Sequence, residues 1–141
     1  MNSPATSRKA PFRFRLDAQS GVPVYRQIID QVQGGIAAGS LAPGDQLPTV
    51  RQVAVDLEIN LNTVLRAYRE LEIRGALETQ QGTGTFVSLQ KVRPDTVERE
   101  RKLTQLVTEF VSRAGAQGFT VQELVALLQD HLPEVETKKR R

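Results

Sequence analysis

Apolar residues recur at helical spacing in three stretches of the first half of the chain. The first stretch follows Gly21 and Pro23, and Gly39 is suited to a left-handed cap at its end. Its apolar residues stand at i, i+3, i+4, i+7 and i+11, which is one face of a helix: Tyr25, Ile28, Ile29, Val32 and Ile36. Two shorter stripes follow, formed by Val50, Val53, Ala54 and Leu57, and then by Val64, Ala67, Tyr68 and Leu71. The pattern therefore predicts three helices.

Polar residues mark where the second and third helices begin. Pro43-Gly44 predicts a turn, after which Thr49 and Gln52 have the spacing of a capping box. Residues 58–60 form the short connection, and Asn60 is suited to cap the third helix. Gly75 ends that helix. A helix, a tight turn and a second helix are therefore expected between residues 49 and 75.

Two segments favour extended structure. Phe12, Phe14 and Leu16 alternate with polar residues, which predicts a short strand. Leu77–Thr79 and Thr85–Val87 can pair as antiparallel strands around a tip at Gln80–Gly84, where glycines allow positive φ and a close approach to phosphate. A helix-turn-helix followed by such a hairpin is a winged helix-turn-helix, an arrangement that points to duplex DNA.

The last third of the chain predicts two more helices. Their stripes are formed by Leu103, Leu106, Val107, Phe110, Val111 and Ala114, and by Val121, Leu124, Val125, Leu127 and Leu128. Gly115–Gly118 is expected to break the helices apart, and Thr120 with Glu123 predicts a second capping box. Two helices of this size cannot bury both stripes on each other alone. A second copy of the chain is the simplest partner, with dimerisation assigned to Leu103, Leu106, Val107, Phe110, Leu124, Leu127 and Leu128.

The predicted fold class is mainly α with a small β-wing. The expected organisation is a disordered N-terminus at 1–11, a winged helix-turn-helix at 12–88, a two-helix dimerisation domain at 94–132 after a linker near Lys91–Pro94, and a charged tail at 133–141. The N-terminus lacks the apolar segment of a signal peptide. Apolar runs fall short of the ~20 residues that a membrane-spanning helix requires. A cytoplasmic protein is expected.

The charge balance says little about a nucleic-acid partner. The 141 residues carry a formal charge of +3, but residues 22–87 hold five arginines and seven acidic residues, a net charge of −2. Attraction to phosphate must therefore come from the placement of a few arginines, from helix N-termini and from the chain ends. Composition alone would not have suggested DNA.

Enzyme and metal chemistry find little support. The chain has no cysteine and a single histidine, His131, at an expected helix C-terminus where it would complement the helix dipole. Gly82-Thr83-Gly84 lies at a hairpin tip, not before a helix, so it is no dinucleotide loop. We therefore expect no catalytic residues, no metal and no cofactor. A protein–protein adaptor is the alternative, and the polar third-helix face argues against it.

The segment from residue 20 to residue 87 resembles the DNA-binding domain of GntR-family transcription regulators. The resemblance rests on Pro23-Val24-Tyr25, Pro43-Gly44-Asp45, Leu47–Arg51, Asn62-Thr63-Val64, Arg66-Ala67-Tyr68 and Gly82–Val87. Tyr25, the Arg66-Ala67-Tyr68 variant and the short tail resemble the YtrA-like subfamily, whose tail serves dimerisation. The resemblance implies a dimeric repressor that binds a palindromic operator in double-stranded DNA. The sequence leaves open whether a small-molecule effector exists.

The motif and the resemblance together define the candidate DNA-binding residues: Thr49, Arg51, Asn60, Asn62, Thr63, Arg66, Gly82 and Thr83. The resemblance makes Arg51 a phosphate or base contact; the alternative is an ion pair with Asp56 or Glu58. Asn62, Thr63 and Arg66 occupy the first turns of the helix that would enter the major groove. Arg69 is expected to form an i,i+3 ion pair.

Two leucines depart from the family pattern. Leu61 stands where relatives often have Pro or Arg, and Leu65 where they often have a small or basic residue. One turn apart, they can contact thymine methyl groups or pack beneath the helix-turn-helix. We favour packing. Gln80-Gln81 also replaces basic residues that are frequent in the wing.

Overall fold

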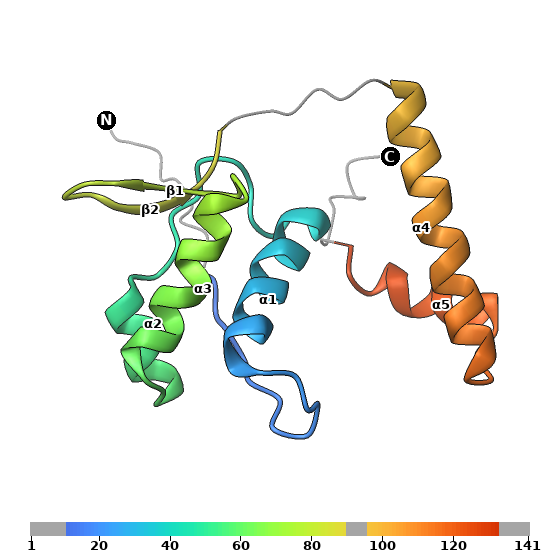
Figure 1. Cartoon of the computed structure of the whole chain (residues 1–141), viewed down its shortest axis with the longest axis horizontal. Helices are drawn as coiled ribbons and strands as arrows, with labels where there is room; N and C mark the ends of the chain where they lie inside the picture. Colours follow the sequence, from blue (N-terminus) through green and yellow to red (C-terminus); the bar gives the residue numbers. More distant parts are fainter. Residues whose placement is uncertain (1–10, 90–95, 133–141) are drawn as a thin grey trace, which may run out of the picture. The chain divides into compact units, whose positions relative to one another are not determined.

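Three helices and a hairpin follow one another in the first half of the chain, and two helices make up the second. The computed structural model describes residues 11–89 and 96–132, which belong to two units divided near residue 90 (Figure 1). The elements are α1 (Val24–Ala38), α2 (Val50–Leu57), α3 (Leu61–Ile73), β1 (Leu77–Gln80), β2 (Gly84–Val87), α4 (Thr96–Ala116) and α5 (Val121–Gln129). The predicted class, mainly α with a small wing, is confirmed. The predictions for residues 1–10, the Lys91–Pro94 linker and the 133–141 tail, including Lys138–Arg141, lie outside the described residues.

Helix α3 is the centre of the first unit, because α1, α2 and β1 all pack against it. The predicted apolar stripes supply the core. The fully enclosed side chains include Ile28 and Val32 of α1, Val53 of α2, and Val64 and Leu71 of α3, each no more than 2% exposed. The described part of this unit buries no charged side chain. A core of this kind holds α3 rigidly while its opposite face remains at the surface.

The wing is an antiparallel hairpin in which Leu77 faces Val87 and Gln80 faces Gly84. The strands are each one residue longer than predicted. A third segment joins them, because Gln46 forms a bridge with Phe86 and the Leu47 N–H donates to the Thr85 carbonyl at 2.8 Å. The segment before α2 thereby anchors the hairpin to the helical core. Sequence spacing gave no sign of this pairing.

The predicted strand around Phe12–Leu16 is wrong. The segment forms no strand and pairs with no described strand. Instead the Gln31 side chain accepts from the Arg15 N–H at 2.9 Å and donates to the Arg15 carbonyl at 2.6 Å. Phe14 is buried and packs edge-to-face against Phe12. Apolar and polar side chains of this segment do alternate between inside and outside. The Gln31 side chain of α1 provides the hydrogen bonds that a partner strand would have supplied.

Two adjacent glycines in α1 differ in their surroundings. A Cβ at Gly35 would lie 3.0 Å from Phe12 and 3.1 Å from Leu41, whereas a Cβ at Gly34 would meet nothing within 4 Å. Gly35 is therefore the position where the N-terminal segment and the loop after α1 approach the helix closely. Gly34 has no comparable packing role.

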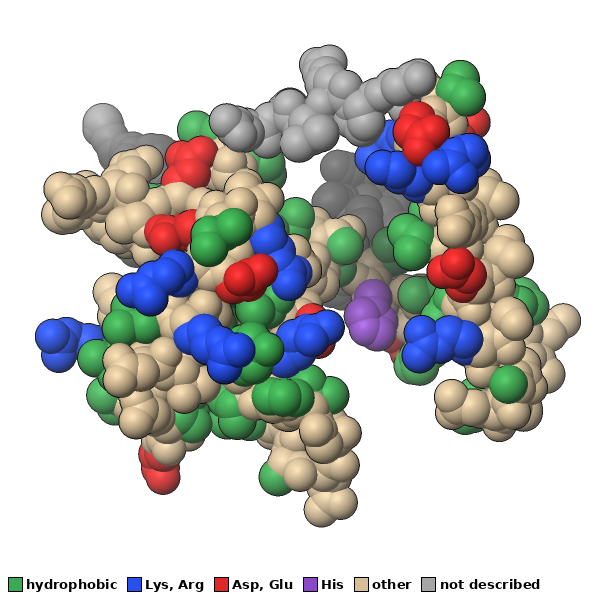
Figure 2. Space-filling model, viewed as in Figure 1, with side chains coloured by type: hydrophobic (Ala, Val, Ile, Leu, Met, Phe, Trp, Pro, Cys, Tyr) green, Lys and Arg blue, Asp and Glu red, His purple; other side chains and the backbone are tan. Residues whose placement is uncertain are grey.

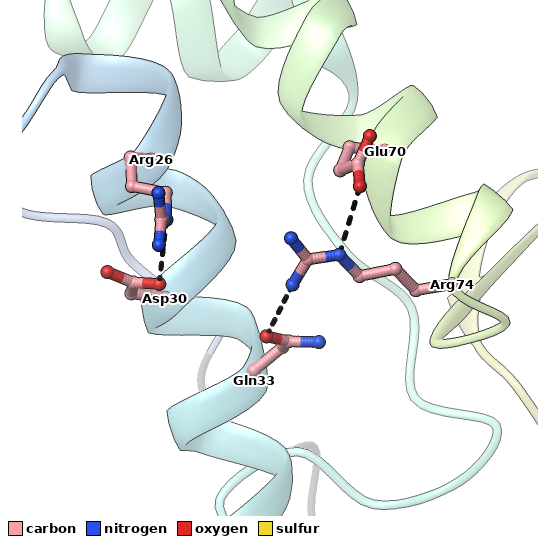
Figure 3. A network of polar contacts seen from close by, with 5 residues as sticks. All are labelled: Arg26, Asp30, Gln33, Glu70 and Arg74. Carbon is pink, nitrogen blue, oxygen red and sulfur yellow. Dashed lines mark hydrogen bonds and ion pairs between the residues drawn. The ribbon is translucent and has the colours of Figure 1, made fainter.

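A polar network ties the exposed edges of α1 and α3 together (Figure 3). The guanidinium of Arg74, the C-cap of α3, donates to Glu70 of α3 at 3.1 Å and to the Gln33 side chain of α1 at 3.0 Å. Arg26 lies 3.7 Å from Asp30 on α1. Exposed pairs of this kind contribute ~0–1 kcal/mol each, so the network orients the helix edges more than it stabilises them.

In the second unit, the described residues form α4 and α5. The Thr120–Glu123 capping box is confirmed, since the Thr120 hydroxyl accepts from the Glu123 N–H and the Glu123 carboxylate accepts from the Thr120 N–H. Helix α4 runs through Gly115, which the predicted break had excluded. It ends in a Schellman motif, where Gly118 has φ +91° and the Phe119 N–H donates to the Ala114 carbonyl at 3.0 Å. Only the left-handed position of Gly118 requires glycine there.

Candidate nucleic-acid interface

The connection between α2 and α3 is a three-residue turn with a left-handed residue. Glu58 has φ +57°, and the Ile59 N–H donates to the Ala54 carbonyl at 3.0 Å. The Glu58 N–H donates to the Val55 carbonyl, so the turn is a Schellman motif that uses a glutamate where glycine is usual. This turn sets the direction of α3 relative to α2.

Both helices begin at the predicted caps. The Thr49 hydroxyl accepts from the Gln52 N–H at 3.0 Å, and the Asn60 side chain accepts from the Asn62 N–H at 2.7 Å. The capping box predicted at α2 is only half formed, because the Gln52 side chain donates to Asp56 instead. The oxygens of Thr49 and Asn60 are thus engaged in holding the two helix starts. A helix N-terminus favours anions, so these caps prepare the sites where phosphate would approach.

The outer face of α3 presents polar groups without partners in the described part of the chain. Asn62 is exposed and Thr63 half-buried, and neither side chain has a hydrogen bond to a described residue. Both lie in the first turn after the Asn60 cap. An amide at this place can pair with an adenine edge, to which Asn donates and from which it accepts.

Arg66 makes a contact that the sequence analysis missed. Its guanidinium carbon lies 3.7 Å from the centre of the Tyr25 ring on α1, a cation–π stack. Both residues belong to the segments that carry the YtrA-like resemblance, which is the one signal that could have linked them. The stack holds Arg66 over α1, while the side chain stays exposed.

Arg51 and Arg69 are exposed, and neither forms an ion pair with a described residue. The alternative for Arg51, a pair with Asp56 or Glu58, is not formed, and Asp56 accepts from Gln52. The ion pair expected for Arg69 is also absent within the described ranges, so that prediction is wrong. Both guanidinium groups are available to phosphate oxygens.

Leu61 and Leu65 do not pack in the way we favoured. Neither belongs to the buried core or to the apolar residues that pack against it, and Leu61 remains 36% exposed. Leu65 is half-buried. The first turns of α3 therefore offer apolar as well as polar side chains at the surface.

The wing tip is held in place from the helical side. The Gln46 amide donates to the Thr83 carbonyl at 3.1 Å, and Gly82 has φ +78°. Gly84 has φ +137°, and a Cβ there would lie 2.5 Å from the Gln46 amide nitrogen. Gly82 and Thr83 are exposed at the tip, as predicted, whereas the positive φ of Gly84 is a conformation that favours glycine.

Tyr68 connects α3 to the segment that leads into α2. Its buried hydroxyl donates to the Pro48 carbonyl at 2.6 Å. Burial raises the pKa of the Tyr68 phenol above its usual range, so the hydroxyl stays protonated and can donate. The contact holds the start of α2, where Thr49 and Arg51 lie, at a constant place on the core.

Charge on the first unit is mixed. Figure 2 shows acidic, basic and apolar side chains interspersed on the face drawn, without a continuous patch of one sign. This agrees with the net charge of −2 over residues 22–87. Long-range steering toward DNA is therefore weak, and local contacts must supply the affinity.

The second unit exposes most of its apolar stripes. The residues assigned to dimerisation have the following exposed fractions: Leu103 56%, Leu106 63%, Val107 50%, Phe110 49%, Leu127 62% and Leu128 54%. Leu124 is half-buried, and Ala114 is the one buried residue in the described part of this unit. The two helices do not enclose their own apolar surface.

The single histidine, the acidic residues and the helix lengths bear on the remaining expectations. His131 Nδ1 lies 3.3 Å from the Leu127 carbonyl just beyond α5, in keeping with its expected place at a helix end. No group of three or more His, Asp or Glu side chains that could hold a metal ion occurs between residues 11 and 89 or between 96 and 132. Over the same ranges, no helix is long and apolar enough to span a bilayer.

Comparisons with known proteins agree with this geometry. Residues 24–87 match the family model "Bacterial regulatory proteins, gntR family". The HTH-type transcriptional regulator YhcF of Bacillus subtilis is 40% identical over 108 residues, 76% of this chain and 88% of that protein. The HTH-type transcriptional repressor YtrA of the same organism is 45% identical over 74 residues, 52% of this chain and 57% of that protein.

The fold extends to a solved structure. A GntR family transcriptional regulator from Listeria monocytogenes superposes with a TM-score of 0.55 at 31% identity, covering 84% of this chain and 99% of that chain. The likeness therefore spans more than the winged helix alone.

Proposed function

The chain belongs to the GntR family of transcriptional regulators, and on that premise we propose that it is a dimeric repressor that binds a near-palindromic operator. The observation that carries the proposal is the start of α3. There a capped helix presents Asn62 and Thr63 without partners among the described residues. The proposal places the protein in the cytoplasm, with the DNA that it binds.

In the proposed complex, α3 enters the major groove and its first turns contact base edges. Arg51 binds the backbone or a base near the start of α2, and Arg69 adds a phosphate contact further along α3. The wing tip at Gly82 and Thr83 approaches the backbone beside the groove, where exposed glycine permits a close approach. Arg66 remains a candidate contact once it leaves Tyr25, or acts by holding α3 against α1.

Dimerisation is assigned to the second unit. Its apolar stripes are exposed in the single chain, an arrangement typical of a surface that binds another protein, and a second copy would cover them. A two-fold dimer presents two α3 helices to two related half-sites, with centres about one helical turn, or a multiple of a turn, apart. The name of the YtrA relative supports repression as the regulatory outcome.

Selection of bound duplexes from a random pool tests this proposal. We expect a site with two inverted half-sites, bound with strong salt dependence. Sedimentation of the free protein should report a dimer at the concentrations used for binding. Recovery of a single asymmetric motif bound by a monomer would contradict the dimer and the palindrome.

Substitutions distinguish base contacts from backbone contacts. Asn62→Ala and Arg51→Ala should each cost roughly 1–3 kcal/mol of specific binding if they contact a base. If Arg51 contacts phosphate alone, random and specific duplexes should weaken together and the salt slope should fall by about one. Arg99→Ala, which removes an exposed arginine from α4, is the matched control. If Asn62→Ala and Arg51→Ala bind specific and random duplexes as tightly as the unsubstituted protein and the Arg99→Ala control do, the proposed interface is excluded.

A further inference from the structure

Helix α3 carries apolar side chains of two kinds. Val64, Ala67, Tyr68 and Leu71 point into the core and are at most 4% exposed. Leu61 and Leu65 lie one turn apart, at positions i and i+4, on a different face that also carries Asn62. The two leucines are therefore not required to complete the core.

Their place on the helix limits what they can contact. Leu61 is the first residue of α3, directly after the Asn60 cap, and Leu65 follows in the second turn. In a helix-turn-helix complex the N-terminal turns of the second helix meet the base edges. An exposed apolar residue at the C-terminal end of α3, such as Ile73, would instead lie away from the groove.

Apolar side chains have one favourable partner on the edges of the major groove. Guanine, adenine and cytosine present hydrogen-bond donors and acceptors there, whereas thymine adds a C5-methyl group. A leucine placed against a donor or acceptor desolvates it without offering a hydrogen bond. Leu61 and Leu65 thus favour thymine and disfavour guanine and cytosine at the positions they cover.

We propose that Leu61 and Leu65 contact thymine methyl groups and thereby determine part of the operator specificity. The inference rests on the proposed binding of α3 in the major groove. In the free protein the Arg66 guanidinium stacks on the Tyr25 ring of α1, 3.7 Å from its centre. With Asn62 suited to adenine, the half-site is expected to be rich in A·T pairs where the first turns of α3 lie.

Replacement of single thymines by deoxyuridine tests the proposal with the full chain. The replacement removes the methyl group and leaves base pairing intact. At one or more positions in each half-site, the affinity of the unsubstituted protein should fall about fourfold, the factor for one apolar carbon returned to water. Unchanged affinity at every thymine would overturn the proposal.

Variants assign the effect to the two leucines. In Leu61→Ala or Leu65→Ala the deoxyuridine effect at the contacted position should shrink toward onefold. Ile73→Ala removes another exposed apolar residue of α3, 75% exposed at its far end, and should retain the full effect. An effect that persists unchanged in both leucine variants would also overturn the proposal. If Leu65→Ala unfolds, the deoxyuridine series and Leu61→Ala still decide.

The two proposals fail in different ways. Absence of any duplex preferred over random DNA contradicts the proposed operator binding itself. A preferred palindrome that is insensitive to loss of thymine methyl groups contradicts the thymine contact alone.

Discussion

The two units of this chain differ in how much of their apolar surface they bury. The winged-helix unit encloses thirteen buried apolar residues in one core, whereas the described part of the second unit buries Ala114 alone. Yet both units have helices with regular apolar stripes. The difference shows that a stripe predicts a helix and a buried face, but the element that covers this face has to be found separately. In the first unit it is α3; in the second we propose that it is another copy.

Phe110→Ala tests the second unit and should have the largest effect. Phe110 is 49% exposed in the single chain. If a dimer encloses it, the substitution should cost about 3–5 kcal/mol of the free energy of dimer unfolding. Sedimentation should show dissociation, and the melting temperature should depend on protein concentration. Ile73→Ala, at an exposed site of the first unit, should change neither value. A melting temperature independent of concentration in the unsubstituted protein would contradict the dimer.

Leu71→Ala tests whether the core of the first unit is formed within a single chain. Leu71 has no exposed surface within the chain, so its loss should cost about 2–5 kcal/mol of the free energy of unfolding. The loss should be the same at all protein concentrations in a chain that ends after Ser88, because the core is intramolecular. Chemical denaturation of that shortened chain measures it. A shortened chain that sediments as a dimer would move the interface into the winged helix.

The adjacent glycines of α1 sharpen the description of the first core. Gly35→Ala should destabilise by about 1–3 kcal/mol, because the added methyl group would crowd Phe12 and Leu41. Gly34→Ala should stabilise by roughly 1 kcal/mol, since it improves helix propensity in open space. Thermal unfolding of both variants compares them directly. Equal shifts of the same sign would refute the packing assigned to Gly35.

Tyr68 links stability to alkaline pH. Burial raises the pKa of its phenol, so its contribution to stability is fully present below about pH 10, the usual tyrosine value. It is lost as pH rises from there toward the raised pKa. Tyr68→Phe should cost about 1–3 kcal/mol at neutral pH, because the Pro48 carbonyl loses its donor. The same variant should lose less additional stability between pH 7 and pH 11, as urea unfolding at both values would show.

The stack of Arg66 on Tyr25 should give the smallest effect. Tyr25→Leu should lower the free energy of unfolding by about 0.5–1 kcal/mol at this exposed site. A fall in operator affinity for Tyr25→Leu, with little change in stability, would show that the stack positions Arg66 for DNA. If affinity falls in Arg66→Ala but not in Tyr25→Leu, Arg66 contacts DNA independently of the stack.

Local spacing by itself determined the helices, their caps and the hairpin. The Thr49 and Asn60 caps and the Thr120–Glu123 box depend on residues within about one turn, and the Leu77–Val87 hairpin on residues within ten positions, so all were predictable. Spacing was misleading where a local pattern has two outcomes. Glycine is compatible with a helix interior, as Gly115 is here, and the Gln52 side chain donates to Asp56 and does not bond to the backbone of the N-cap residue.

The tertiary structure alone decided which distant groups meet. Gln31 pairs with the backbone of Arg15, Gln46 joins the wing, and Arg66 stacks on Tyr25. These contacts join residues 16 to 41 positions apart, and no periodicity encodes them, because they depend on how α1 and α3 pack around the shared core. The same packing left Leu61 and Leu65 outside that core. Their position follows from the direction in which α3 is held, which the hydrophobic character of a leucine cannot reveal.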